Sequence, residues 1–157
     1  MIISEKNLDS YIDYLHQNIK GKKIVFTNGC FDILHPSHIF YLQEAKEQGD
    51  FLIVAINSDE SIKQLKGKDR PIFNQQDRAI ILNSLNMVDL VIKFKGNTVH
   101  HLLRKIKPNI FVKGGDYTIN TILEKPVLEE INCKAYFTRI FKDKSTTEII
   151  KSIKNIK

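Results

Sequence analysis

The sequence contains few cysteines. Only Cys30 and Cys133 occur, and they do not form a CxxC pair. The cysteines and histidines also lack the spacing of a structural zinc site. These absences exclude a disulfide-stapled scaffold and a zinc domain, and they predict a reduced, cytoplasmic protein.

Long hydrophobic runs are also missing. No apolar segment approaches the roughly 18 residues of a membrane-spanning helix, and the N-terminus lacks the apolar core of a signal peptide. The sequence therefore predicts a protein that neither spans a membrane nor is secreted. Its 157 residues have the length of a single domain, 1–157, and no linker or repeat divides them.

Basic residues are in excess but are not clustered. The formal net charge is +6, which permits an anionic ligand. The lysines are scattered and aromatic residues are not interleaved with them, so no nucleic-acid partner is expected. Phosphorylated small molecules explain the charge as well, and so does solubility alone.

Short apolar runs alternate with helical patterns along the chain. Strands are expected at residues 23–28, 51–56, 88–94, 110–112 and 133–137. Helices are expected at 4–19, 37–48, 75–86, 99–106, 119–131 and 145–156, with a short one after residue 59. The first helix is amphipathic, so residues 1–20 should pack on the rest of the domain. Ile80, Ile81 and Leu85 are expected to face the core.

This alternation predicts an α/β fold. We expect a Rossmann-like, doubly wound parallel sheet of five strands in a single domain, because strands that alternate with helices form right-handed βαβ crossovers. Ligands bind such sheets in the crevice at the carboxyl ends of the strands.

The segment KIVFTNGCFDILHPSH, residues 23–38, carries the strongest functional signal. A buried strand should end at Asn28-Gly29, and Pro36 fits the first turn of the helix that follows. His35 and His38 would then lie on one helical face at the helix N-terminus, where free N–H groups and a partial positive charge favour phosphate. A lone histidine near a helix start is more often structural, but two beside a glycine turn favour a functional reading.

Two further turns should meet the first at the crevice. One is Lys113-Gly114-Gly115-Asp116, and the other is Lys144-Ser145-Thr146-Thr147 at the start of the last helix. Each is weak alone, since a glycine pair is often a plain turn and a serine at this place is often a helix cap. The sequence has no GxxxxGK[ST] and no GxGxxG, so neither a P-loop nor a dinucleotide fingerprint is supported.

Five motifs in order identify a family resemblance. They are TNGCFDILHPSH, NSDESIKQLKGKDRP, DRAIIL followed by VDLVIKF, VKGGDY, and STTEIIKSI. Together they resemble the nucleotidyltransferases of the cytidylyltransferase-like superfamily, whose signature is HxGH. The LKG…RP and VKGGDY segments are most similar to the bacterial D-glycero-β-D-manno-heptose 1-phosphate adenylyltransferases.

The resemblance implies transfer of a nucleotidyl group from a nucleoside triphosphate, ATP favoured, to a sugar phosphate, with Mg²⁺ held by the nucleotide phosphates and no protein-bound metal. It also implies a homodimer. The residues implied in catalysis are His35, His38, Lys66 and Arg78. Those implied in nucleotide binding are Thr27, Asn28, Gly29, Phe31, Gly115, Asp116, Ser145 and Thr146. Asp32 is implied on the acceptor side.

The chain departs from the family pattern at Ser37, where the HxGH motif has glycine. It also has Lys95-Gly96-Asn97-Thr98-Val99 where the heptose branch usually has an acidic pair and Thr-Pro. Two alternatives therefore stay open at this point. One is a cytidylyltransferase for glycerol 3-phosphate or a related polyol phosphate, and the other is a nucleotide-binding module without turnover.

Overall fold

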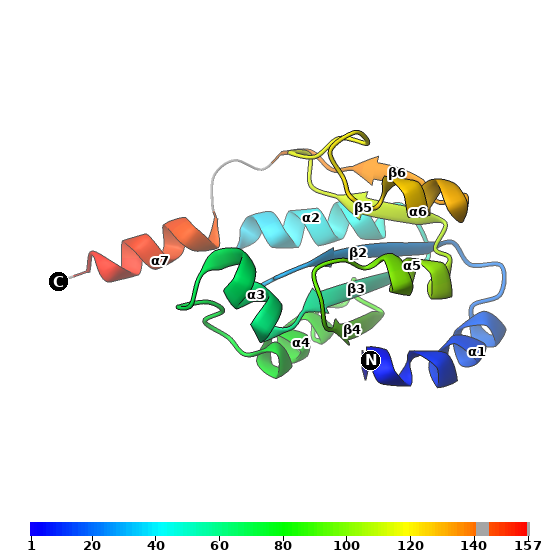
Figure 1. Cartoon of the computed structure of the whole chain (residues 1–157), viewed down its shortest axis with the longest axis horizontal. Coiled ribbons are helices and arrows are strands. Elements are labelled where there is room, and N and C mark those ends of the chain that lie inside the picture. The colour runs from blue at the N-terminus through cyan, green and yellow to red at the C-terminus, as the bar shows by residue number, and fades with distance from the viewer. Residues whose placement is uncertain (141–144, 157) are drawn as a thin grey trace.

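A parallel β-sheet forms the middle layer of the molecule (Figure 1). The computed structural model describes residues 1–140 and 145–156. In these residues the sheet has six strands, which are β1 (Ile2–Ser4), β2 (Ile24–Gly29), β3 (Phe51–Asn57), β4 (Leu90–Phe94), β5 (Ile110–Lys113) and β6 (Lys134–Phe137). Every neighbouring pair is parallel, as the alternating sequence pattern predicts.

The order of the strands places β2 near the centre of the sheet. The order is β1-β4-β3-β2-β5-β6, so the chain runs outward from β2 through β3 to β4 and then returns to the other side of β2 for β5 and β6. A doubly wound sheet has its ligand crevice where the winding reverses, outside the carboxyl ends of the strands. Here the reversal lies between β2 and β5, which end at Gly29 and Lys113.

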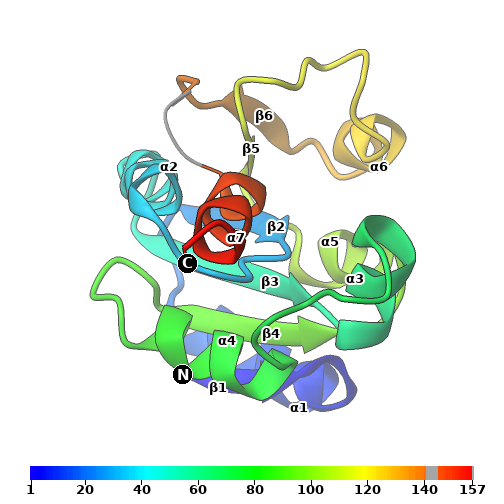
Figure 2. The ribbon, with the colours of Figure 1, turned by 90° about the vertical axis from the view of Figure 1, so that its left-hand side faces the viewer.

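Helices cover both faces of the sheet. In the described residues they are α1 (Leu8–Asn18), α2 (Pro36–Lys46), α3 (Asp59–Lys66), α4 (Gln75–Asn83), α5 (His100–Ile106), α6 (Lys125–Glu130) and α7 (Thr146–Lys154). Figure 2 shows α2 on one side of the sheet and α1, α5 and α6 on the other. None of the helices in the described residues is long and apolar enough to cross a membrane.

Two apolar cores result, one under each layer of helices. The run 51–56 supplies both, because alternate side chains of a strand point to opposite faces. Leu52, Val54 and Ile56 join the core under α2 and α4, whereas Ile53 and Ala55 join the core under α1, α5 and α6. All five are fully buried.

The N-terminal segment differs from the prediction, and the sheet consequently has six strands where the sequence predicted five. The predicted helix at 4–19 begins only at Leu8, after a 3₁₀ turn at Glu5–Asn7. Ile2 and Ile3 instead extend the sheet beside β4, opposite Val91 and Ile92. Pairing satisfies backbone groups on both strands, but a run of three residues is too short to be recognised from the sequence.

The burial of α4 also differs from the prediction. Ile80 is 49% exposed, and the fully buried positions of this helix are Arg78, Ala79 and Leu82. Leu85 packs against the core as predicted, but the prediction for Ile80 was wrong because an arginine occupies a position on the buried stripe of the helix.

Candidate active site

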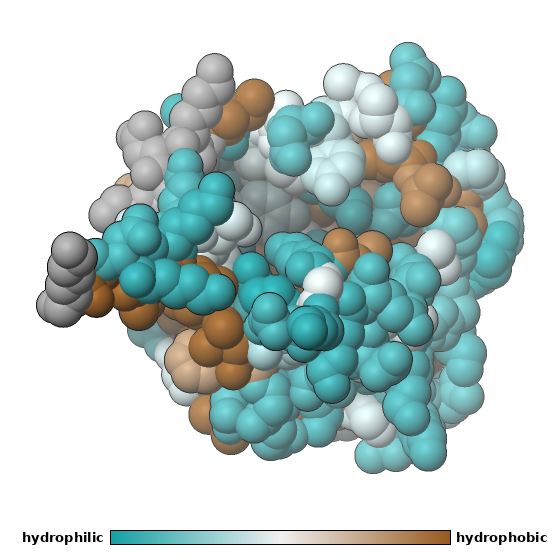
Figure 3. Space-filling view, turned by 60° about the vertical axis from the view of Figure 1, so that its left-hand side comes forward, coloured by the Kyte–Doolittle hydropathy of each residue, from teal (hydrophilic) through white to brown (hydrophobic). Residues whose placement is uncertain are grey.

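A cavity of about 570 Å³ opens at the carboxyl ends of β2 and β5, within the usual range for small-molecule sites. Its lining includes the turn after β2, the start of α2, the end of α3 and residues 121–124. Figure 3 shows that this side of the molecule is hollowed, with both hydrophilic and apolar residues around the hollow. The cavity lies at the reversal point of the sheet, where the fold is expected to bind ligands.

The two histidines lie together at the start of α2. His35 is the N-cap residue, Pro36 occupies the first turn, and the rings of His35 and His38 stack with their centroids 3.9 Å apart. The buried Nδ1 atoms of both rings have no hydrogen-bond partner among the described residues. Buried polar atoms are nearly always paired, so these two nitrogens have hydrogen-bonding capacity left for a ligand.

The pKa values of both histidines are lowered, which favours their neutral forms. Burial is the main cause that lowers the pKa of His38 to about 4, and the nearby His35 and Lys66 lower it further. Burial also lowers the pKa of His35, against a smaller opposing effect of Glu148. A neutral imidazole donates one hydrogen bond through its single N–H, so the two rings can bind phosphate oxygens as donors while uncharged.

The end of β2 and the turn after it line the cavity. Asn28 and Gly29 both line it, and the buried Oδ1 of Asn28 is a third polar atom without a partner in the described part of the chain. A Cβ at Gly29 would lie 2.9 Å from the ring of Phe31, which has a positive φ of 43° and packs 5.3 Å from the His38 ring. The glycine therefore permits the close packing that holds Phe31 against His38.

A second helix N-terminus faces the histidines. Ser145 caps α7 in a capping box with Glu148, and the Thr146 hydroxyl donates to the carbonyl of Ile33 at 3.3 Å. This contact brings the start of α7 next to the start of α2, as Figure 1 also shows. Thr146 lines the cavity, whereas the Ser145 hydroxyl is engaged in the cap. Lys144, the first residue of this predicted turn, lies outside the described residues.

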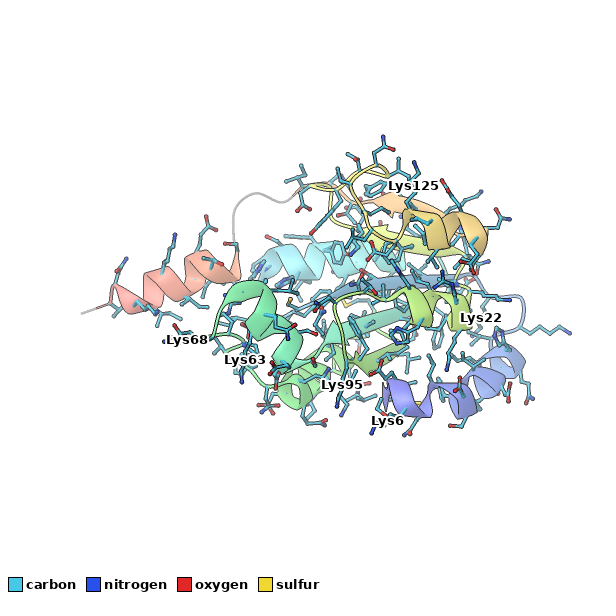
Figure 4. All side chains as sticks on the ribbon, viewed as in Figure 1. Lys6, Lys22, Lys63, Lys68, Lys95 and Lys125 are labelled. Carbon is cyan, nitrogen blue, oxygen red and sulfur yellow. The ribbon has the colours of Figure 1, made fainter. Side chains whose placement is uncertain are left out.

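The last turn of α3 contributes a positively charged side chain to the cavity lining. Lys66 in the last turn of that helix is exposed and lines the cavity. Figure 4 shows Lys63 and Lys68 near the same end of α3, while Lys6 and Lys22 lie on other parts of the surface. Of these three lysines of the α3 end, Lys66 is the one that lines the cavity together with His38.

Three predicted site residues occupy other places than the sequence suggested. Arg78 has a side chain with no exposed surface, and it bonds to Asp59 and to the carbonyls of residues 30, 57 and 73. Its guanidinium therefore links the walls of the crevice through these contacts. Thr27 is fully buried, donates to the carbonyl of Val112 at 3.0 Å and bonds to Tyr41, so it lies behind the cavity and not in its wall.

Asp32 was predicted on the acceptor side, but its carboxylate is already occupied. It is 2% exposed, pairs with Arg70 at 2.7 Å and accepts hydrogen bonds from the backbone N–H groups of Ile72 and Phe73. Its oxygens thus hold the loop after α3. Asp32 borders the cavity, and its carboxylate also positions that loop.

The GGD turn is explained partly by internal packing. A Cβ at Gly115 would lie 2.1 Å from the carbonyl oxygen of Thr138, so the close approach of the 138–139 backbone requires glycine. Gly115 also borders a small cavity of about 170 Å³ that Ser37, His38 and Arg139 help to line. Asp116 is exposed.

Sequence reasoning did not single out Lys113 and Glu124 individually. Their side chains form an ion pair at 3.2 Å, only 14% and 8% exposed, and both residues line the cavity. The signal for Lys113 was available, because it ends β5 at the reversal point of the sheet. Glu124 precedes a six-residue helix in a weakly patterned region, and nothing in its neighbourhood pointed to the cavity.

Comparisons with known proteins match most of the chain. The family model described as cytidylyltransferase-like matches residues 26–154. Similar curated proteins include the bifunctional protein HldE of Aliarcobacter butzleri, 50% identical over 133 residues that make up 85% of this chain and 27% of that protein. The bifunctional protein HldE of Campylobacter concisus is 45% identical over 152 residues, which are 97% of this chain and 31% of that protein. The chain thus spans about three-tenths of the length of these relatives.

Solved structures show the same architecture. The lipopolysaccharide core biosynthesis protein from Thermoplasma volcanium GSS1 is 32% identical with a TM-score of 0.61, over 79% of this chain and 100% of that one. A pantoate-beta-alanine ligase from Francisella tularensis, solved with a β,γ-ATP compound and β-alanine, has a TM-score of 0.65 over 98% of this chain and 77% of that one. At 19% identity the ligase shows the fold alone.

Proposed function

Because this chain belongs to the cytidylyltransferase-like family, we propose that it transfers a nucleotidyl group from a nucleoside triphosphate, ATP favoured, to a sugar phosphate and releases pyrophosphate. The favoured acceptor is D-glycero-D-manno-heptose 1-phosphate. The observation that carries the proposal is the stacked pair His35 and His38, whose unpartnered nitrogens lie at the start of α2 opposite the start of α7.

The chemistry needs positioning more than a strong base. A phosphate monoester is already a nucleophile at neutral pH, so in-line approach to the α-phosphorus requires orientation and stabilisation of the oxygens that gain charge. In this proposal the two neutral histidines donate to oxygens of the reacting phosphate. Lys66 and the first-turn N–H groups of α7 offset the charge of the leaving pyrophosphate.

We propose that Mg²⁺ is bound through the phosphates of the nucleotide. The described residues include no group of three or more His, Cys, Asp or Glu side chains that would hold a metal ion, and Asp32 is occupied by Arg70 and the backbone of the 72–73 loop. Mg²⁺ commonly binds through substrate phosphates with several waters, and such an ion would add positive charge at the pyrophosphate.

The sugar-phosphate acceptor is supported by two observations. The VKGGDY and LKG…RP segments resemble the heptose branch, and the matching curated relatives carry the name HldE. The second observation extends to the Thermoplasma relative, which is named for lipopolysaccharide core biosynthesis. We therefore expect the product to be an activated sugar for cell-surface polysaccharide. A cytoplasmic location and a homodimer are part of this proposal.

Pyrophosphate release tests the proposal directly. The purified chain should be assayed with each of the four nucleoside triphosphates against heptose 1-phosphate and glycerol 3-phosphate in the presence of Mg²⁺. ATP with heptose 1-phosphate should give the highest kcat/KM. A preference for CTP with glycerol 3-phosphate would replace the proposed activity by that of a polyol-phosphate cytidylyltransferase. Nucleotide binding without pyrophosphate release in any pair would mean that the chain is a binding module.

A further inference from the structure

The carboxylate of Asp32 is occupied by Arg70 and the 72–73 backbone. No residue of the cavity is then assigned to bind the acceptor. A sugar phosphate presents two chemistries to a site, an anionic phosphate and a set of hydroxyl donors. The site must therefore supply a cation near the phosphate and acceptors for the hydroxyls. Among the described residues that line the cavity there are two lysines, Lys66 and Lys113.

Lys113 and Glu124 form a charged pair in the cavity wall. Lys113 ends β5, Glu124 immediately precedes α6, and the two side chains meet at 3.2 Å. The ammonium of Lys113 also lies 5.4 Å and 5.5 Å from the ring centres of Phe111 and Tyr117. These contacts hold the ammonium in one place while one of its three N–H donors is sufficient for Glu124.

The pair is costly to bury for stability alone. Removing two charges from water consumes most or all of their mutual attraction, so a buried ion pair is weak evidence for a stabilising role. In this protein the pair borders an open cavity of about 570 Å³ and not the apolar core. Tyr117, Ile122 and Leu123 line the cavity beside it and offer apolar surface to the carbon skeleton of a ligand.

We propose that Lys113 and Glu124 form the acceptor subsite, in which Glu124 accepts hydrogen bonds from sugar hydroxyls and Lys113 binds an oxygen of the acceptor phosphate. The inference rests on the proposed nucleotidyl transfer and specifies the class of acceptor as a polyhydroxylated phosphate monoester. Lys66, which lines the cavity with His38, then serves the triphosphate.

Isosteric replacements test the subsite. Glu124→Gln keeps the shape of the side chain and removes its charge, and Lys113→Met removes the ammonium and keeps most of the stem. With ATP saturating, each change should lower kcat/KM for heptose 1-phosphate by about tenfold or more, while KM for ATP stays within about twofold. Glu124→Gln should affect glycerol 3-phosphate less, because that acceptor offers fewer hydroxyls.

The matched control is Glu130→Gln. Glu130 is the last residue of α6, the helix that Glu124 precedes, and it pairs with Arg104 at 2.9 Å. Both side chains of this pair are about half exposed, and neither lines the cavity. This variant should leave both KM values at those of the natural chain. A rise in acceptor KM as large as that of Glu124→Gln would mean that the effect is not local to the cavity, and it would overturn the assignment.

The double variant Lys113→Met/Glu124→Gln guards against loss of folding, because it leaves no unpaired buried charge. The proposal predicts a folded double variant that still has a raised KM for the acceptor. If the double variant regains both stability and the natural acceptor KM, the pair is a structural link between β5 and α6 and the proposal fails. A natural chain that releases no pyrophosphate with any acceptor would instead refute the proposed function itself.

Discussion

Arg78 offers a sharp contrast between a structural and a catalytic role. The family resemblance implies that it holds phosphate, whereas the structure buries its side chain completely against Asp59 and three backbone carbonyls. Arg78→Met keeps an unbranched side chain in the space that the arginine side chain fills, and it removes every N–H donor of that side chain. The carbonyls of Cys30, Asn57 and Phe73 would lose their partner in a place that water reaches poorly.

The expected cost follows from these contacts. Each buried acceptor left without a partner costs about 1–3 kcal/mol, although part is recovered as the chain relaxes. Breaking a buried ion pair by removing one member costs about 3–5 kcal/mol, and the partial exposure of Asp59, 37%, places this case at the lower end. We therefore expect a loss of at least about 3 kcal/mol in the free energy of unfolding, or at least roughly 6 °C in Tm for a chain of this size.

Denaturation and turnover must be measured on the same preparation. Guanidinium titration should give a lower midpoint with an unchanged m-value, and kcat at 25 °C should stay within a few-fold of the natural chain. Arg104→Met, at an exposed ion pair, is the control and should keep the natural midpoint. A natural midpoint for Arg78→Met together with a fall in kcat of about 100-fold would refute the structural role and restore the phosphate role.

Three further predictions concern the histidine helix and α7. Ser145→Ala should lower stability by about 1 kcal/mol and leave KM for ATP unchanged, because the Ser145 hydroxyl is used in the cap. Thr146→Val should instead raise KM for ATP, and the reverse pattern would contradict the geometry. Ser37→Gly should leave turnover within a few-fold, measured as pyrophosphate release, and a silent natural chain beside an active variant would show that serine disables catalysis. Because the pKa of His38 is lowered from its ordinary value of 6.5 to about 4, the unfolded chain binds more protons between these values, so stability should fall as pH decreases from 6.5 towards 4. His38→Gln should weaken that fall in the denaturation midpoint, and an unchanged pH dependence would show that His38 is not its source.

Much of the fold could be predicted because it follows from local apolar patterns. The run 51–56 predicted a strand buried on both faces, and β3 has this burial. The place of the histidines at the start of α2 also followed from local signals, namely Asn28-Gly29 and Pro36. Local patterns were insufficient for β1, whose three residues become a strand only when β4 is beside them.

The remaining differences arise from contacts between distant parts of the chain. Asp32 binds Arg70 and the 72–73 backbone across about forty residues, so its sequence neighbours do not show that its carboxylate is occupied. Arg78 looks like an ordinary polar residue until the carbonyls around it are placed. Lys113 and Glu124 meet only once β5 lies at the reversal point of the sheet.

The central claim is that the paired histidines stabilise a phosphate during nucleotidyl transfer, and His38→Ala tests it most directly. Pyrophosphate release from ATP should be followed with heptose 1-phosphate as acceptor, beside a guanidinium titration of the same variant. The account predicts that kcat falls by about 100-fold or more while the variant remains folded at the assay temperature. Natural turnover in a folded His38→Ala chain would contradict it.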